Sequence, residues 1–102
     1  MQLYGLKLTV IIADDGQYSA IRHNMAENFG RSSHYRLANP DFVRFGEAFG
    51  MRARRLDSPD QLGAAVAEAL AGERSTLIDC PLEVLPMREL YDLSPRPAAA
   101  AR

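Results

Sequence analysis

The feature that most constrains the fold is an apolar, β-branched segment at residues 6–13 that ends at two carboxylates and a glycine. Such a run is typical of a strand buried in a parallel sheet. Asp14-Asp15-Gly16 is a sequence that favours a turn. Residues 18–29 then place apolar side chains at helical spacing, with Gly30 as a C-cap. The sequence therefore predicts a buried strand that leads directly into a helix.

A second helix start follows at Asn39-Pro40-Asp41, with Asn39 expected as the N-cap and Pro40 at the first helical position. The predicted helix covers residues 41–49. It carries three phenylalanines, which we expect in the core: Phe42, Phe45 and Phe49. Gly50 ends it.

Two more strands and one more helix complete the pattern. Residues 51–56 predict a short strand whose arginines indicate a solvated edge, and residues 61–71 predict a helix with Leu62, Val66 and Leu70 on its apolar face. Residues 76–82 predict the third strand, near an end or an edge because of Pro81.

Strands that alternate with helices imply parallel pairing through right-handed crossovers. The predicted fold class is α/β: a partial three-layer sandwich with a parallel sheet, in the order strand, helix, helix, strand, helix, strand. Three such strands cover little core, so we expect part of a larger domain that is marginally stable or self-associates. Residues 94–102, rich in proline and alanine, are expected to be a disordered tail.

Charge and composition exclude several function classes. The formal net charge is −1, which gives no field to recruit nucleic acid or an anionic membrane. No apolar run approaches the ~20 residues that span a bilayer, and no signal-peptide pattern is present, so we expect a cytoplasmic protein. The lone Cys80 cannot form an internal disulfide and argues against zinc; we expect it to be a small packed side chain.

The junction between the first strand and the first helix is the candidate functional segment. Ligands of open parallel sheets bind beyond the carboxyl ends of the strands. Carboxylate oxygens can hold a divalent cation, and the unpaired N–H groups of a first helical turn can hold an anion. Together they suit a metal–diphosphate pair. The spacing is equally consistent with Asp14 and Asp15 acting only as helix caps.

Three segments in this order resemble the C-terminal part of thiamine diphosphate-dependent enzymes, in the superfamily of acetolactate synthase, benzoylformate decarboxylase and pyruvate decarboxylase. They are VIIADDGQYSAIR, NPDFVRFGEAFG and TLIDCPL. The resemblance covers residues 6–86. It implies that residues 1–93 are the C-terminal part of a domain that binds the diphosphate side of thiamine diphosphate with Mg²⁺, as a fragment or split subunit of a 2-oxo acid lyase or carboligase (a lyase or transferase).

The resemblance also implies roles for single residues. It places five residues at the cofactor: Asp15, Gln17, Tyr18, Ser19 and Ala20. Asp15 would ligate Mg²⁺ through its side chain and Gln17 through its backbone carbonyl, while the N–H groups of Tyr18 and Ser19 would meet the diphosphate. Asp14 stands where the family has Asn, and an extra carboxylate near a diphosphate is unfavourable. We therefore expect Asp14→Asn to be neutral or helpful.

The family's Gly-Asp-Gly element and its cofactor-activating Glu do not occur in this sequence. We therefore expect no catalytic residue in this chain, no activity of the chain alone, and a partner that is the missing N-terminal part or another subunit. Two alternatives stay open. A receiver-type Mg²⁺-binding signalling module would need a downstream Lys, but Lys7 is the only Lys and precedes the acids. A plain α/β interaction domain would have no site.

Overall fold

The computed structural model describes residues 1–83. They belong to two compact units: residues 1–15 with 38–83, and residues 16–37. The expected tail at 94–102 and the last part of the domain expected over 1–93 lie outside the described residues.

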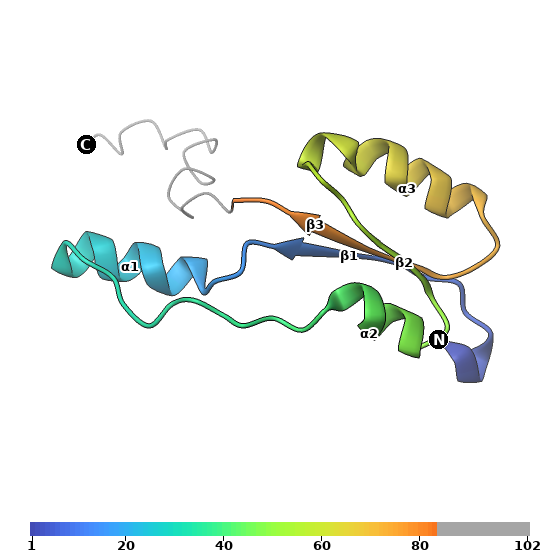
Figure 1. The fold of residues 1–102 in the computed structure, drawn as a ribbon, viewed down its shortest axis with the longest axis horizontal. Helices are drawn as coiled ribbons and strands as arrows, with labels where there is room; N and C mark the ends of the chain where they lie inside the picture. Colours follow the sequence, from blue (N-terminus) through green and yellow to red (C-terminus); the bar gives the residue numbers. More distant parts are fainter. Residues whose placement is uncertain (84–102) are drawn as a thin grey trace, which may run out of the picture. The chain divides into compact units, whose positions relative to one another are not determined.

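The first unit is built on a three-stranded parallel sheet (Figure 1). Its strands are β1 (Thr9–Asp14), β2 (Arg52–Arg55) and β3 (Thr76–Pro81), in the order β1-β3-β2. Thr9 of β1 and Arg52 of β2 both lie opposite Thr76 of β3. The parallel α/β sheet is therefore confirmed. Pro81 lies at the end of its strand as predicted, but that strand is the middle one and not an edge.

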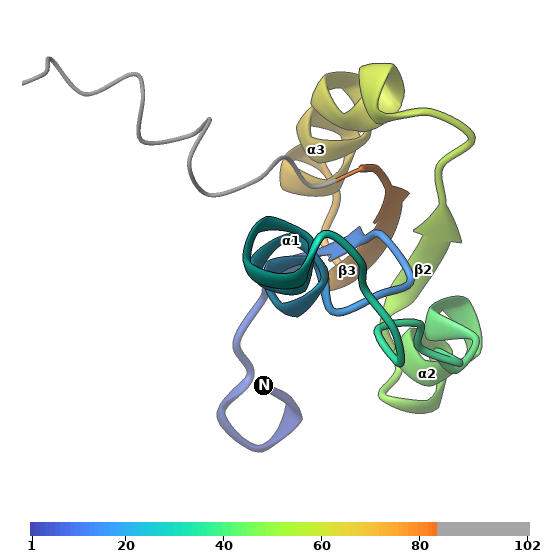
Figure 2. The ribbon, with the colours of Figure 1, turned by 90° about the vertical axis from the view of Figure 1, so that its left-hand side faces the viewer.

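Two helices cover opposite faces of this sheet, α2 (Phe42–Ala48) on one and α3 (Leu62–Ala71) on the other (Figures 1 and 2). Successive side chains of β3 alternate between the two faces. Leu77 contacts the α2 side, whereas Ile78 and Cys80 pack with α3. Asp79 therefore shares the α2 face with Leu77.

The core of the unit lies between β3 and α3. It is a cluster of five buried residues, Leu56, Ala65, Ala69, Ile78 and Cys80. The packing of Cys80 is as expected, but the face predicted for α3 is wrong in part, because Leu70 is 65% exposed. The alanines turn toward the sheet instead, since their small side chains let the helix approach it closely.

Strand β1 differs most from its prediction. It begins at Thr9 and not at residue 6, and it is an edge strand in which Val10 is 37% and Ile11 46% exposed. The expectation of a buried strand is wrong because β3 takes the middle of the sheet. β1 consequently has a strand neighbour on one side only within residues 1–83.

Helix α2 begins one residue later than predicted. Its N-cap is Asp41, whose side chain accepts from the Val43 and Arg44 amides at 3.0 and 3.2 Å. The expected Asn39 cap is therefore wrong. The expected phenylalanine core is wrong for two of its three members: Phe45 and Phe49 stack edge to face, with ring centroids 5.2 Å apart, and each is about half exposed, whereas Phe42 is half-buried.

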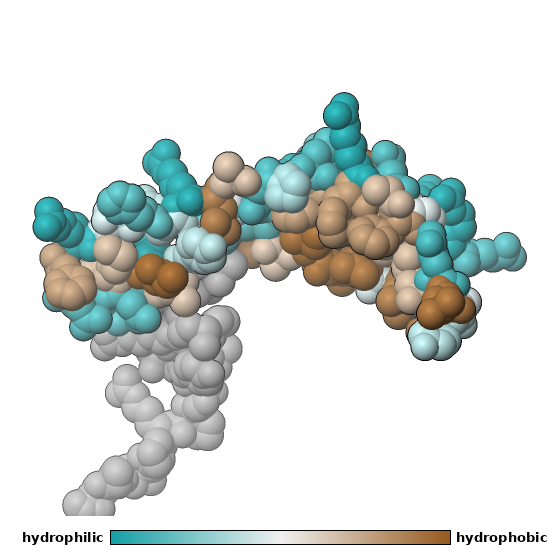
Figure 3. Space-filling view, turned by 90° about the horizontal axis from the view of Figure 1, so that it is seen from below, coloured by the Kyte–Doolittle hydropathy of each residue, from teal (hydrophilic) through white to brown (hydrophobic). Residues whose placement is uncertain are grey.

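The residue that α2 turns toward the sheet is Gly46, which is buried. A Cβ atom built there would lie 3.0 Å from the Ala53 Cβ and 3.1 Å from the Leu77 Cβ. The close approach leaves the phenylalanines of α2 beside the contact instead of within it. Figure 3 shows apolar side chains gathered over the part of the chain that carries α2.

The second unit consists of α1 (Ser19–Phe29) and the segment after it. The helix matches its predicted bounds within one residue, with Tyr18 as N-cap and Gly30 at φ 69° closing its end. No residue of α1 is buried. Neither α1 nor any other helix in residues 1–83 has the length and apolar character needed to cross a membrane.

Candidate functional site

The residues expected at the cofactor follow one another along the chain, at the end of β1 and the start of α1. Asp15 comes directly after β1 and belongs to the first unit. Gln17, Tyr18, Ser19 and Ala20 belong to the second unit.

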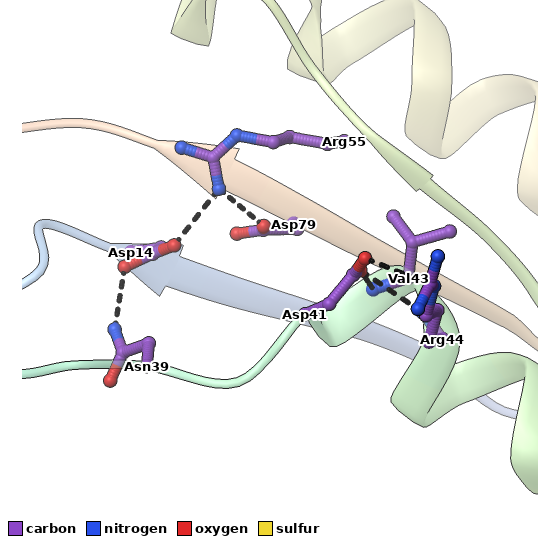
Figure 4. A network of polar contacts seen from close by, with 7 residues as sticks. All are labelled: Asp14, Asn39, Asp41, Val43, Arg44, Arg55 and Asp79. Carbon is purple, nitrogen blue, oxygen red and sulfur yellow. Dashed lines mark hydrogen bonds and ion pairs between the residues drawn. The ribbon is translucent and has the colours of Figure 1, made fainter.

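At the carboxyl end of the sheet, each strand contributes one charged residue to a single network (Figure 4). Arg55 of β2 donates through one nitrogen, Nη1, to Asp14 Oδ2 of β1 at 3.0 Å and to Asp79 Oδ2 of β3 at 2.5 Å. The Asp14 and Asp79 side chains are 10% and 3% exposed, whereas Arg55 is 54% exposed. One half-exposed cation thus faces two buried carboxylates.

Asp14 is also held by two further contacts. Its Oδ1 accepts from Asn39 Nδ2 at 2.9 Å, which is where the side chain of the expected cap goes. Its backbone carbonyl accepts from the Leu82 amide at 3.1 Å. These contacts bear on the expectation that Asp14→Asn is neutral or helpful, because the substitution would remove the negative charge that pairs with Arg55.

Asp79 is the most deeply buried ionisable group of this network. Burial raises the pKa of its carboxyl above the ordinary 3.8, the ion pair with Arg55 opposes that rise, and the neighbouring Asp14 adds to it. Asp79 Oδ1 has no hydrogen-bond partner among the described residues. The same two carboxylates raise the pKa of Arg55, so the guanidinium stays charged.

Sequence reasoning missed this network. Arg55 was expected on a solvated edge, and β2 is indeed an edge strand. The other two arginines of β2 pair with Glu68 of α3: Arg52 at 2.9 Å and Arg54 at 3.3 Å. The one available signal was a charged residue near the end of each predicted strand, which becomes informative only once the register is known.

The turn into α1 begins at Gly16, whose φ of 67° favours glycine. Gln17 forms an antiparallel bridge with Arg36. The two backbone bonds beside it run from the Tyr18 amide to the Tyr35 carbonyl, at 2.7 Å, and from the Leu37 amide to the Gly16 carbonyl, at 2.9 Å. The Gln17 carbonyl expected at the metal takes part in neither bond.

These backbone hydrogen bonds also affect the amides that are expected to bind the diphosphate. The Tyr18 amide expected at the diphosphate already donates to Tyr35, so that bond must open before it can bind a ligand. Ser19 and Ala20 begin the first turn of α1, an eleven-residue helix whose N-cap makes no side-chain capping bond. First-turn amides have no partner within the helix and are suited to an anion.

The donors, each taken by itself, are of the chemical kinds that bind a metal ion and a diphosphate. Asp15 offers carboxylate oxygens and Gln17 a backbone carbonyl, both hard ligands suited to Mg²⁺. Residues 1–83 contain no group of three or more His, Cys, Asp or Glu side chains able to hold a metal ion. An octahedral Mg²⁺ would therefore take its other ligands from water, from phosphate oxygens or from another part of the protein.

Comparison with known proteins adds an independent finding. Residues 1–80 match the family model described as "Thiamine pyrophosphate enzyme, C-terminal TPP binding domain". Among curated proteins, an acetolactate synthase of Bacillus subtilis is 29% identical over 73 residues, which cover 72% of this chain and 13% of that protein. A 3D-(3,5/4)-trihydroxycyclohexane-1,2-dione hydrolase of Halalkalibacterium halodurans is 30% identical over 99 residues, covering 87% of this chain and 15% of that protein.

A solved structure shares the fold. The thiamine diphosphate-dependent 4-hydroxybenzoylformate decarboxylase of Rhodococcus jostii RHA1 superposes with a TM-score of 0.67 at 26% identity, over 81% of this chain and 16% of that one. The chain thus spans about a seventh of the length of the relatives that it matches.

Proposed function

The chain belongs to the thiamine pyrophosphate enzymes, as part of their C-terminal TPP binding domain, and we propose that it supplies the metal–diphosphate side of a thiamine diphosphate site. The enzyme we propose is a 2-oxo acid lyase or carboligase similar to acetolactate synthase. The family match decides against the receiver-domain alternative. What carries the proposal is that residues 15–20 bring a carboxylate, a backbone carbonyl and first-turn amides in unbroken succession.

Each residue of that stretch has a distinct proposed role. Asp15 binds Mg²⁺ through its carboxylate, and Gln17 binds it through its carbonyl. The amides of Ser19 and Ala20 bind the diphosphate, joined by that of Tyr18 when its bond to Tyr35 opens. Thiamine diphosphate supplies the carbanion chemistry when bound, and this chain holds and orients it.

Asp14 fits this proposal better than its charge alone suggests. A carboxylate beside a diphosphate is unfavourable, but Asp14 is paired with Arg55 at 3.0 Å and is only 10% exposed. Its charge is therefore partly balanced within the first unit, by a cation that it shares with Asp79. We assign Asp14 a structural role and keep Asp15 as the metal ligand.

We also propose that the rest of the site comes from the missing N-terminal part of the enzyme or from a partner subunit. The chain spans 13–16% of the length of these relatives. Apolar side chains are exposed on β1 (Val10 and Ile11), on α2 (Phe45) and at the C-cap of α2 (Phe49). Exposed apolar surface of this kind is typical of an interface. Without its partner, the chain would cover this surface by self-association.

The test is a titration of thiamine diphosphate and Mg²⁺ into the full chain combined with a protein that carries the Gly-Asp-Gly segment. We expect Asp15→Ala to weaken cofactor binding at least about 10-fold, a loss that even partners of metal ligands produce. Gln17→Ala is the matched control, because it keeps the backbone carbonyl. Binding by Asp15→Ala equal to that of the unmodified chain would overturn the proposal.

A further inference from the structure

Arg55 reaches across the whole sheet. It lies on β2, one edge of the sheet, and its Nη1 contacts Asp14 at the end of β1, the other edge, as well as Asp79 on the middle strand (Figure 4). Asp14 is the last residue of β1, and Asp15 follows it. Arg55 therefore binds the side chain of the residue that directly precedes the proposed metal ligand.

From this arrangement we propose that Arg55 is a positioning residue for Asp15, acting through Asp14. The inference rests on the proposed function, in which Asp15 binds the metal. Arg55 fixes Oδ2 of Asp14, while Asn39 fixes Oδ1 and the Leu82 amide fixes the backbone carbonyl. With all three oxygens held, the direction in which the chain leaves β1 is set.

Of these three contacts, only the one from Arg55 carries charge. Asp14 and Asp79 both accept from Arg55 Nη1, so the carboxylates lie close together with the Arg55 cation between them. Without that cation, two buried like charges would repel each other. Asp79 sits within the middle strand, so the displacement would fall on Asp14 at the end of the edge strand, and it would pass to Asp15.

The sheet contains a matched control. Arg52 lies on the same strand, is similarly exposed at 62%, and forms one ion pair at 2.9 Å, but with Glu68 of α3. That pair is on the opposite face of the sheet from Asp14. A general loss of charge or packing on β2 would therefore appear in Arg52→Met as well, whereas a positioning effect would appear only at Arg55.

The experiment compares Arg55→Met, Arg55→Lys and Arg52→Met in the full chain by NMR relaxation of the Asp15 amide. We expect its order parameter to be near the rigid value of about 0.85 in the unmodified chain and in Arg52→Met, and to fall toward about 0.6 in Arg55→Met. Arg55→Lys should restore most of the order, since an ammonium group can still donate to both carboxylates. In the combined assembly, Arg55→Met should weaken Mg²⁺-dependent cofactor binding about 10–100-fold.

The outcomes separate this inference from the proposed function. An Asp15 amide that is already mobile in the unmodified chain, or equally ordered in Arg55→Met, would overturn the positioning role whatever Asp15→Ala does. Order lost in Arg55→Met while Asp15→Ala binds cofactor normally would overturn the proposed function and leave the positioning of Asp15 intact. If Arg55→Met does not fold, Arg55→Gln takes its place, because it also removes the charge: a mobile Asp15 supports the inference, and an Asp15 as ordered as in the unmodified chain contradicts it.

Discussion

Replacing Gly46 with alanine should destabilise the chain, although alanine is the better helix former. Gly46 is buried where α2 lies tightly against the sheet. The added Cβ would lie 3.0 Å from the Ala53 Cβ and 3.1 Å from the Leu77 Cβ. Both of these atoms are fixed by the strand backbones and cannot rotate away. The helix itself would have to shift outward.

Two opposing terms set the size of the effect. Alanine gains about 0.8–1.0 kcal/mol over glycine in a helix interior. Overpacking a tight contact costs about 1–3 kcal/mol, and the rigid neighbours place this site in the upper part of that range. We expect a net loss of about 1–2 kcal/mol in the free energy of unfolding, or a fall of several degrees in Tm for a domain of this size.

Gly63 in α3 provides the control, because a Cβ built there meets nothing within 4 Å. Gly63→Ala should therefore stabilise the chain by about 0.4–1 kcal/mol. Urea unfolding followed by circular dichroism, at a concentration where light scattering gives all variants the same oligomeric state, measures both changes. If Gly46→Ala is as stable as the unmodified chain, or if both variants shift in the same direction, the close contact of α2 with the sheet does not limit packing.

The remaining predictions concern charge, capping, association and activity. Asp79→Asn should flatten the pH dependence of stability. Burial raises the folded-state pKa of Asp79 above the ordinary 3.8, so the folded state holds the proton more tightly than the unfolded state. The free energy of unfolding of the unmodified chain therefore falls as the pH rises from the ordinary pKa through the raised one. Urea midpoints across this range check it, and an unchanged slope contradicts it. Asp41→Ala should lower the free energy of unfolding by about 0.5–2 kcal/mol, since it removes the acceptor of two α2 amides. Asp57→Ala, which removes another exposed carboxylate, is the control; equal thermal melts of the two variants would show that the cap contributes nothing. The unmodified chain should self-associate, and Ile11→Asp should shift it toward monomer in light scattering; a monomeric unmodified chain refutes this. Without its partner, the chain should turn over neither pyruvate nor benzoylformate with thiamine diphosphate and Mg²⁺, and product formed above a no-protein blank would be the contrary result.

The order and type of the elements could be predicted because their signals are local. Each strand is a short apolar or alternating run, and Gly30 closes α1 in the left-handed conformation that glycine favours. The parallel sheet followed from the alternation of strands and helices. The order of the strands did not follow, because apolar content marks both β1 and β3, and burial depends on which of them lies between the other two.

In the candidate site, too, local features could be predicted from the sequence and long-range contacts could not. Residues 15–20 could be singled out because they are adjacent in the sequence and match a family pattern. The Arg55 network could not, since its three members are brought together only by the register that sets Arg55 opposite Asp79 and Asp14 opposite Pro81. The wrong prediction of an Asn39 cap has the same cause. The local sequence pattern placed the Asn39 side chain at the start of α2, but that side chain donates instead to Asp14, which is distant in the sequence.

The position of β3 has a consequence for how the chain is made. Both edge strands precede the middle strand in the sequence, so β1 and β2 emerge from the ribosome before the strand that joins them exists. Within residues 1–83 the sheet has no pairing that a shorter nascent chain could form. Folding of this sheet must therefore wait for residues 76–81. Until then the apolar β1 is unpaired, a state in which nascent chains are prone to aggregate. A premature stop before Thr76 would release a chain with both edges and no sheet.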